Sequence, residues 1–280
     1  MDRQKPQGSR IGLALGGGGA KGLAHIGVLK VLEEYKIPIY CIAGSSVGAF
    51  IGGAYASGVP VEEMVHVGRK LRWSDLGRLT ISKLGFRDGS RMEAFIRKTF
   101  PVTTFEELRI PFAAVATDIC TGAKCVLDRG DLARAIRASC AIPGYFTPVI
   151  DQDNRMLVDG GIVDVLPVSV VKAMGAQRTI GVDVYPFTQL KKPPTNLYHI
   201  YNQAMAIRGY TLGNHWHQSA DLLVVPNLSH IAWDDLSRTD EIIAAGEEAM
   251  RRLINECQQL LTKKSPGFFS RLRLAFSTQE

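Results

Sequence analysis

Short apolar runs alternate with amphipathic stretches along most of this chain. The runs 11–16 and 112–119 are almost entirely apolar, which is typical of strands buried on both faces of a sheet. The stretch 23–34 places its apolar residues at helical spacing and predicts a helix. By the same reasoning we expect further strands at 38–43, 123–127, 156–158, 179–184 and 221–225, and further helices at 47–56, 61–71, 91–100, 131–139, 168–174, 197–212 and 239–261. Strands that alternate with helices predict an α/β fold whose mainly parallel sheet is covered on both faces.

Two stretches of the chain do not follow the simple pattern of strands and helices. The stretch 37–61 carries no charged residue and is long enough to span a bilayer. It also contains Pro38, Pro60 and several glycines, so a buried strand, a tight turn and a buried helix explain it better. Near the other end of the chain, residues 237–240 resemble a capping box that opens the helix ending near 261.

A single folded domain fits the length and composition. The 280 residues are 46% hydrophobic and 21% charged, as in globular proteins that bury a substantial core. No linker rich in Pro, Gly or Ser divides the chain, so we expect one domain at 11–262 with its core motifs at 11–181. A disordered N-terminus at 1–10 precedes it, and a basic tail at 263–280 follows. Scattered cysteines without a CxxC pair, and an N-terminus without an apolar signal core, favour a cytoplasmic protein or one peripheral on the inner face of a membrane.

Basic residues gather in segment 69–98, from Arg69 to Lys98. It holds nine Lys or Arg against three Asp or Glu, an excess equal to the +6 charge of the whole chain. Because apolar residues are interleaved with the cations, the segment suits an anionic membrane surface, near which each cation contributes about 1 kcal/mol. A solvated face with its own small core is the alternative. Nucleic acid is not expected as a partner, since no recognition motif accompanies the charge.

A glycine loop, Gly17-Gly18-Gly19-Ala20-Lys21-Gly22, stands between the first predicted strand and helix. Its spacing matches the dinucleotide fingerprint, but the second strand ends at 43–46 without the acidic residue that would bond a ribose, so no nucleotide cofactor is expected. Successive N–H groups at a helix start can bind an anion. We therefore predict that the N–H groups of Gly17, Gly18 and Gly19 hold an oxyanion. A tight turn without a ligand is the alternative.

The second glycine-marked block is Gly44-Ser45-Ser46-Val47-Gly48, between a predicted strand and a predicted helix. It fits a nucleophile elbow with Ser46 as the nucleophile. The sharp turn brings strand and helix together two residues before and two residues after the serine, which explains Gly44 and Gly48. Ser45 falls one place early for this pattern.

A nucleophilic serine needs a base, and no histidine stands out as one. His25 follows the glycine loop but could equally face the packing of its helix, and His215 and His217 make no zinc pair. Asp159 ends a short apolar strand, and Gly160-Gly161 then lets the backbone turn. Burial would have to raise its pKa toward neutral pH for it to act as a base. The rival carboxylates, each at the end of an apolar run, are Asp118, Asp164 and Asp183.

Together these blocks resemble the patatin-like phospholipases, in particular the bacterial branch related to the neuropathy target esterase domain. The family's GGGx(R/K)G loop is matched at 17–22, with Lys21 where many members have Arg, and Gly22 closes the loop. Its GxSxG elbow is matched at 44–48, its DG(G/A) block at 159–161, and segment 137–143 is similar to a further block of the family. The resemblance is strong over residues 11–181.

The resemblance implies a patatin-like three-layer α/β/α sandwich with a Ser46–Asp159 dyad and no histidine. It implies hydrolysis of acyl esters of phospholipids or lysophospholipids through an acyl-serine intermediate, with no metal and no cofactor. Two alternatives stay open: transfer of the same acyl group to another acceptor, and a lipid-binding regulatory protein with little turnover.

Overall fold

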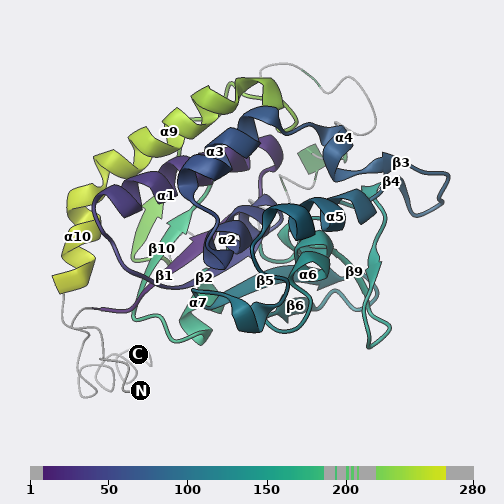
Figure 1. Ribbon diagram of the computed structural model, residues 1–280, viewed down its shortest axis with the longest axis horizontal. Helices are drawn as coiled ribbons and strands as arrows, with labels where there is room; N and C mark the ends of the chain where they lie inside the picture. The colour runs from purple at the N-terminus through teal and green to yellow at the C-terminus, as the bar shows by residue number, and fades with distance from the viewer. Residues whose placement is uncertain are drawn as a thin grey trace, which may run out of the picture.

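The computed structural model describes residues 9–185 and 219–262, together with positions 193, 200, 201, 203, 204 and 207 (Figure 1). Most of the helix expected at 197–212 lies outside these residues. His215, His217, the tail at 263–280 and positions 1–8 of the N-terminus lie outside them as well.

A mixed central sheet forms the middle of the molecule. In the described part of the chain its strand order is β11-β10-β1-β2-β5-β9-β8, and β6 also pairs with β5. The parallel strands are β11 (Leu222–Val224), β10 (Arg178–Val182), β1 (Ile11–Leu15), β2 (Ile39–Ser45) and β5 (Phe112–Asp118). The antiparallel strands are β6 (Lys124–Leu127), β8 (Val149–Ile150) and β9 (Met156–Asp159). The prediction of a mainly parallel sheet is confirmed.

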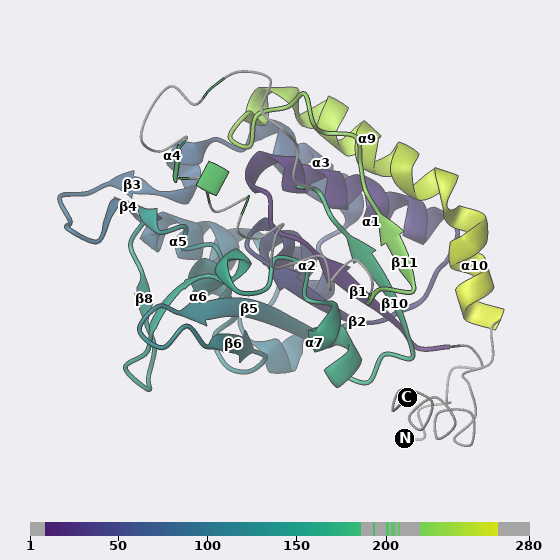
Figure 2. The same ribbon diagram turned by 180° about the vertical axis from the view of Figure 1, so that it is seen from behind.

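Helices flank this sheet on both faces (Figures 1 and 2). One face carries the larger set, which shares one apolar core: α1 (Ala24–Glu34), α2 (Val47–Ser57), α3 (Val61–Lys70), α5 (Ser90–Thr99), α6 (Leu132–Ser139), α9 (Thr239–Arg252) and α10 (Ile254–Thr262). Helix α7 (Val168–Ala173) covers the opposite face. The shorter helical turns are η1 (Gly19–Leu23), α4 (Trp73–Leu76), η2 (Phe105–Glu107), η3 (Gly160–Ile162) and η4 (Leu236–Arg238).

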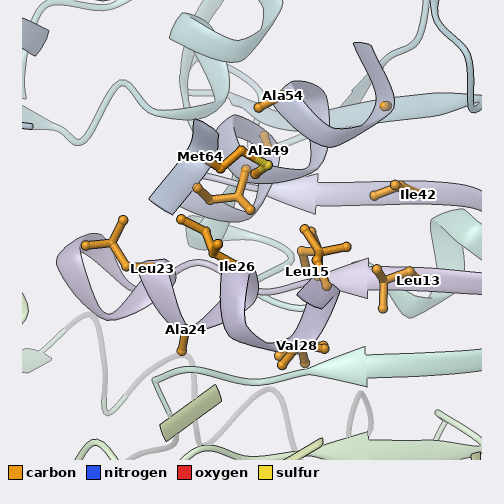
Figure 3. Packing of buried hydrophobic residues seen from close by; sticks show 14 of the residues in the cluster. Leu13, Leu15, Leu23, Ala24, Ile26, Val28, Ile42, Ala49, Ala54 and Met64 are labelled. Carbon is orange, nitrogen blue, oxygen red and sulfur yellow. The ribbon is translucent and has the colours of Figure 1, made fainter. Parts of the chain in front are cut away.

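Alternation along the strands explains why the two faces differ. Leu13 and Leu15 of β1 belong to the core on the side of α1 and α2, which also contains Ile26 (Figure 3). Between them, Ala14 points to the other face and packs with Val171 of α7. Large side chains therefore fill the thick helical layer, and small ones let α7 approach closely.

A second, smaller sheet lies beside the larger helical layer. It consists of β3 (Arg78–Leu79), β4 (Gly85–Asp88) and β7 (Gly144–Phe146). The β3–β4 hairpin projects away from the body of the molecule (Figures 1 and 2).

The uncharged stretch 37–61 forms strand β2, a turn and helix α2, so that prediction is confirmed. Among the helices of the described residues, none combines the length and apolarity needed to cross a membrane. The capping box expected at 237–240 is wrong. Asp235 instead accepts the N–H of Ser237 at 3.0 Å, so a short helical turn starts earlier in the chain. The expected long helix is also divided at Leu253, which lies between α9 and α10.

Candidate active site

The carboxyl ends of β1 and β2 meet at one edge of the sheet, and both glycine-marked loops start there. Ser46 stands between β2 and α2 with φ 53° and ψ −126°, a backbone conformation that is strained for a residue with a side chain. A Cβ on Gly44 would lie 2.3 Å from the Gly48 carbonyl oxygen, and one on Gly48 would lie 2.1 Å from the Leu15 carbonyl oxygen. The sharp turn that presents Ser46 therefore requires glycine at both positions.

Strand β5 brings Ser46 and Asp159 together. β2 pairs with β5 as far as Ser45 opposite Val115, and β9 pairs from the next residue, with Asp159 opposite Ala116. Since β6 pairs with residues 114–117, it occupies the other edge of β5. β9 thus pairs with the same edge of β5 as β2, and its pairing begins where that of β2 ends at the elbow. In this arrangement Ser46 Oγ donates a hydrogen bond to Asp159 Oδ2 at 2.6 Å.

The carboxylate of Asp159 is held from several sides. Its Oδ1 accepts the N–H of Gly161 at 2.8 Å, and its backbone carbonyl accepts the Thr117 hydroxyl at 2.9 Å. A Cβ on Gly160 would lie 2.1 Å from the Val115 carbonyl oxygen, so the chain passes β5 too closely for any other residue. These contacts hold the carboxylate in one orientation toward Ser46.

Burial changes the acidity of this site. It raises the pKa of Asp159 from its ordinary value of 3.8 to about 6, although the hydrogen bonds from Ser46 and Gly161 oppose the change. The pKa of the buried Cys140 thiol is raised well above its usual value, through burial and the nearby Asp159 charge. A carboxylate with a pKa of about 6 is a stronger base than an ordinary Asp and is still ionised at neutral pH.

The rival carboxylates have other partners. Asp118 accepts the Thr121 hydroxyl at 2.6 Å, Asp164 pairs with Lys124 at 2.9 Å, and Asp183 accepts the N–H of Tyr185 at 3.0 Å. His25 is fully buried, its Nε2 lies 2.8 Å from the Gly16 carbonyl oxygen, and burial lowers its pKa to about 4. Of the four candidate carboxylates, Asp159 is the one hydrogen-bonded to Ser46.

Sequence reasoning gave no role to Ser139, at the end of α6. Its hydroxyl accepts the Ser46 N–H at 2.9 Å and donates to the Val115 carbonyl at 2.5 Å. It therefore joins the elbow to β5 through a buried side chain. Segment 137–143 is similar to a block of the family, but nothing in its local spacing points to Ser46.

The glycine loop differs in one respect from the prediction. Gly17 donates its N–H to the Val165 carbonyl at 3.0 Å, so this N–H is engaged and is not offered to an oxyanion. Within the part of the chain that the structure describes, the N–H groups of Gly18 and Gly19 have no protein acceptor. Gly19 adopts φ 59°, and a Cβ there would lie 2.4 Å from the Trp233 carbonyl oxygen. The loop therefore leaves two adjacent donors beside Ser46 rather than three.

Lys21 and Gly22 support the loop. Lys21 is buried with its Nζ 4.6 Å from the centre of the Tyr185 ring, and burial lowers its pKa to about 8. A Cβ on Gly22 would lie 2.2 Å from a methyl of Val47, so glycine lets η1 lie against α2.

Two hollows meet at Ser46. The first is an apolar cleft of ≈ 90 Å³ along α2, and its lining includes Val47, Phe50, Ile51, Ala54, Met64, Val67, Trp73, Leu76, Met92, Phe95 and Phe146. Figure 3 shows Met64 of α3 and Ile26 of α1 approaching α2 on this side. The second hollow, of ≈ 160 Å³, is more polar, and its lining includes Gly17, Gly18, Gly19, Asp159, Gly161, Tyr185, Tyr201 and Trp233. Across the described ranges, no three His, Cys, Asp or Glu side chains gather closely enough to hold a metal ion.

The profile of the patatin-like phospholipase family matches residues 13–172. An uncharacterised NTE family protein of Mycobacterium tuberculosis is 42% identical over 178 residues, which cover 62% of this chain and 49% of that protein. The lysophospholipase NTE1 of Mycosarcoma maydis is 40% identical over 185 residues, which cover 63% of this chain and 10% of that protein. The matched part is thus about half the length of the mycobacterial relative.

The fold also has a counterpart among solved structures. The crystal structure of VipD from Legionella pneumophila superposes with a TM-score of 0.61 at 12% sequence identity, covering 90% of this chain and 67% of that one. At such low identity the likeness concerns the fold alone, and it agrees with a central sheet flanked by helices.

Proposed function

Because this chain belongs to the patatin-like phospholipase family, we propose that it is a serine hydrolase that cleaves acyl esters of phospholipids or lysophospholipids through a Ser46–Asp159 dyad. The observation that carries this proposal is the 2.6 Å hydrogen bond from Ser46 Oγ to the buried Asp159 carboxylate, at the mouth of an apolar cleft. The name of the lysophospholipase relative agrees with such a substrate.

The proposed reaction has two halves. Asp159 takes the proton of Ser46 while Oγ attacks the acyl carbonyl, and the N–H groups of Gly18 and Gly19 receive the developing oxyanion. The C–O bond to the alcohol then breaks, the alcohol leaves with the proton from Asp159, and the acyl group remains on Ser46. Water next gives a proton to Asp159 and attacks the acyl-serine. The bond between the acyl carbon and Oγ then breaks, Asp159 returns the proton to Ser46, and the fatty acid is released.

The two hollows suit the two ends of such a substrate. Ser46, Phe50 and Ala54 lie on one side of α2 at helical spacing and line the apolar cleft, where an acyl chain would lose its contact with water. From Ser46, just before α2, to Ala54 the chain advances about 12 Å along the helix axis, so the lining of the cleft extends at least that far from the proposed nucleophile. The more polar hollow beside Asp159 would take the alcohol and its headgroup.

Narrowing the apolar cleft at Ala54 should change the preferred chain length. We expect Ala54→Phe to lower the rate on a long-chain ester relative to a short-chain ester about 10-fold, because each excluded methylene forfeits part of its burial free energy. The ratio of kcat/KM values for esters of the two lengths is the measurement. Tyr55→Phe, on α2 but outside the cleft lining, is the control and should leave the ratio unchanged. Equal ratios in both variants would mean that the acyl chain lies elsewhere.

Labelling with a fluorophosphonate tests the proposed nucleophile directly. We expect a single adduct on Ser46, mapped by mass spectrometry, which disappears in Ser46→Ala and is slowed in Asp159→Asn. The labelling is run with and without anionic vesicles, so that a site opened only at a membrane is also sampled. A folded protein that gives no adduct under either condition, or an adduct on another serine, would contradict the proposed dyad.

We also propose an anionic membrane surface, and a peripheral position there, for segment 69–98. The structure engages several of its cations internally: Arg87 donates to the Gly77 carbonyl at 2.9 Å, Arg91 to the Ser74 carbonyl at 3.0 Å, and Arg97 to Asp131. Replacing these arginines would therefore disturb the fold as well as the charge. The exposed cations of this segment are the better place to examine membrane contact.

A further inference from the structure

The β3–β4 hairpin exposes large apolar side chains at its tip. Leu79, Ile81, Leu84 and Phe86 are 71%, 108%, 56% and 69% exposed, although they lie within eight consecutive residues. Contiguous exposed apolar side chains of this size are typical of surfaces that bind a protein or a membrane. The hairpin tip, defined here as residues 79–86, projects from the body of the molecule (Figure 2).

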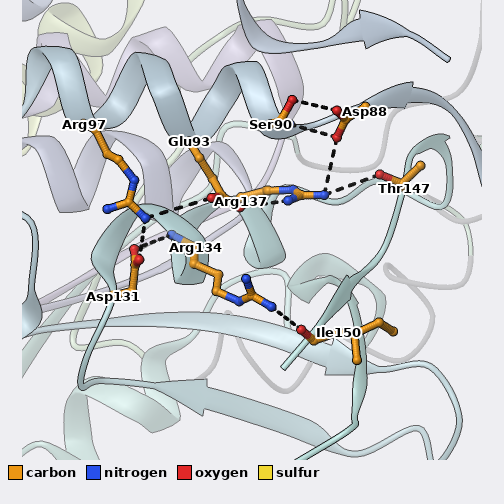
Figure 4. Close-up of polar contacts among 9 residues, drawn as sticks. All are labelled: Asp88, Ser90, Glu93, Arg97, Asp131, Arg134, Arg137, Thr147 and Ile150. Carbon is orange, nitrogen blue, oxygen red and sulfur yellow. Dashed lines mark hydrogen bonds and ion pairs between the residues drawn. The ribbon is translucent and has the colours of Figure 1, made fainter. Parts of the chain in front are cut away.

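The base of this hairpin is held firmly. Arg137 of α6 donates to Glu93 of α5 at 2.8 Å and lies 3.7 Å from Asp88 at the end of β4 (Figure 4). Asp88 also accepts the N–H and the hydroxyl of Ser90 at 3.0 and 2.6 Å. The N–H of Thr147 donates to the Arg87 carbonyl at 2.9 Å, continuing the pairing of β4 with β7. These hydrogen bonds and the ion pair fix the base of the hairpin, so that its apolar tip points away from the protein.

The charge around the tip indicates what it contacts. Arg78 and Lys83 are exposed within or beside the tip, so cations stand among the apolar side chains. This combination matches the boundary of an anionic bilayer, where acyl chains receive apolar groups and phosphates receive Lys and Arg. A protein partner or a second copy of the chain would have to supply an equally apolar and acidic surface.

The hairpin is also connected to the apolar cleft. Trp73 and Leu76 precede the hairpin, Met92 follows it, and Phe146 lies on the neighbouring strand β7, and all four line the cleft. A Cβ on Gly77 would lie 2.6 Å from the Phe146 ring, which shows how closely the start of the hairpin packs on the cleft wall.

We propose that residues 79–86 insert into the interfacial region of an anionic phospholipid bilayer and that the hairpin thereby places the apolar cleft next to the membrane. Insertion itself is independent of turnover, whereas the delivery of substrate to Ser46 rests on the function proposed above. Insertion differs from adsorption of a charged face, because burial of apolar side chains resists salt and attraction between charges does not.

Vesicle binding by the full-length protein tests the insertion. With vesicles containing phosphatidylserine, we expect the double variant Ile81→Ser, Leu84→Ser to bind at least about 10-fold more weakly, since two buried aliphatic side chains contribute to partitioning. The control is Ile119→Ser, Val126→Ser, which removes two other exposed apolar residues, 46% and 42% exposed, from the end and edge of the central sheet. We expect Arg78→Ala, Lys83→Ala to weaken binding mainly at low salt.

Unchanged binding of the tip variant, or an equal loss in the control, would overturn the proposal. The proposal would also be overturned if the wild type did not bind vesicles but formed a dimer, and if the tip variant were monomeric. That result would assign the tip to a protein contact. Hydrolysis of a water-soluble short-chain ester, measured in parallel, should be equal in wild type and tip variant. Loss of that activity in every protein, with vesicle binding intact, would refute the hydrolase and leave the insertion standing.

Discussion

Replacing Ser46 by Ala should lower kcat/KM for ester hydrolysis by about 10⁴-fold or more, because no other group would form the acyl intermediate. The change removes one hydroxyl and its 2.6 Å hydrogen bond to Asp159, and it leaves the glycines that shape the elbow in place. Initial rates on a short-chain and a long-chain ester, with a thermal unfolding curve for each protein, are the measurements.

Ser45→Ala is the matched control for this experiment. Ser45 is adjacent and fully buried, and its hydroxyl has no hydrogen-bond partner within the described residues. Its removal should leave the rate close to that of the wild type, since it breaks no hydrogen bond among the described residues and relieves the cost of burying an unpaired hydroxyl. Retention of activity in Ser46→Ala, or its loss in Ser45→Ala alone, would assign the nucleophile to another residue.

Asp159→Asn should lower kcat/KM by about 10²- to 10⁴-fold, the usual contribution of a general base. The Asn oxygen would accept the N–H of Gly161, as Asp159 Oδ1 does at 2.8 Å, and its amide group would then face Ser46 as a donor. Ser46 would lose its proton acceptor while the local fold stayed intact. Initial rates of purified wild type and variant, compared at neutral pH, check this expectation.

The pH dependence of the wild type should report the same carboxylate. Its pKa is raised by burial to about 6, and the ionised form is the base. We therefore expect kcat/KM to be level from about one pH unit above that value, to halve at the pKa, and to fall by close to tenfold per pH unit well below it. A profile that stays level well below pH 6 would exclude Asp159 as the proton acceptor.

Stability should move in the opposite direction, which separates a lost base from a lost fold. The folded-state pKa lies above the ordinary 3.8, so ionising Asp159 costs folding free energy. This cost is absent below the ordinary value, grows as the pH rises from 3.8 to about 6, and is complete above that. Asp159→Asn should therefore be more stable than the wild type at pH 8, by up to ~3 kcal/mol, and no more stable near pH 3. Chemical denaturation at the two pH values measures this.

Much of the fold follows from local patterns. The strands at 11–15 and 112–118, and the turn that leads into α2, appear where apolar runs and glycines predicted them. The long C-terminal helix was predicted less well. The Asp235 carboxylate accepts the N–H of Ser237, so the helical turn begins before the predicted cap at Ser237. Which of two nearby side chains caps a helix depends on the conformation of the whole preceding loop.

The local sequence does not show which N–H groups of the glycine loop lack an acceptor. Gly17, Gly18 and Gly19 look alike in the sequence, yet Val165 accepts the N–H of Gly17 alone. Val165 lies almost 150 positions further along the chain, so no local pattern distinguishes the three glycines. Ser139 is a similar case, because its bond to the Ser46 N–H joins residues that are 93 positions apart.

By itself, the sequence determined the parts of this protein that depend on local sterics. Gly44 and Gly48 permit one sharp turn around Ser46, and Gly160 permits the close passage of the chain after Asp159. The tertiary structure decided which groups meet: β9 continues the edge of β5 that β2 leaves, and this register alone places Asp159 against Ser46. It also decided that the apolar residues of the hairpin tip face water rather than a core. Conformational preference is carried by neighbouring residues, whereas burial and hydrogen-bond partners are supplied by chain segments that come together only on folding.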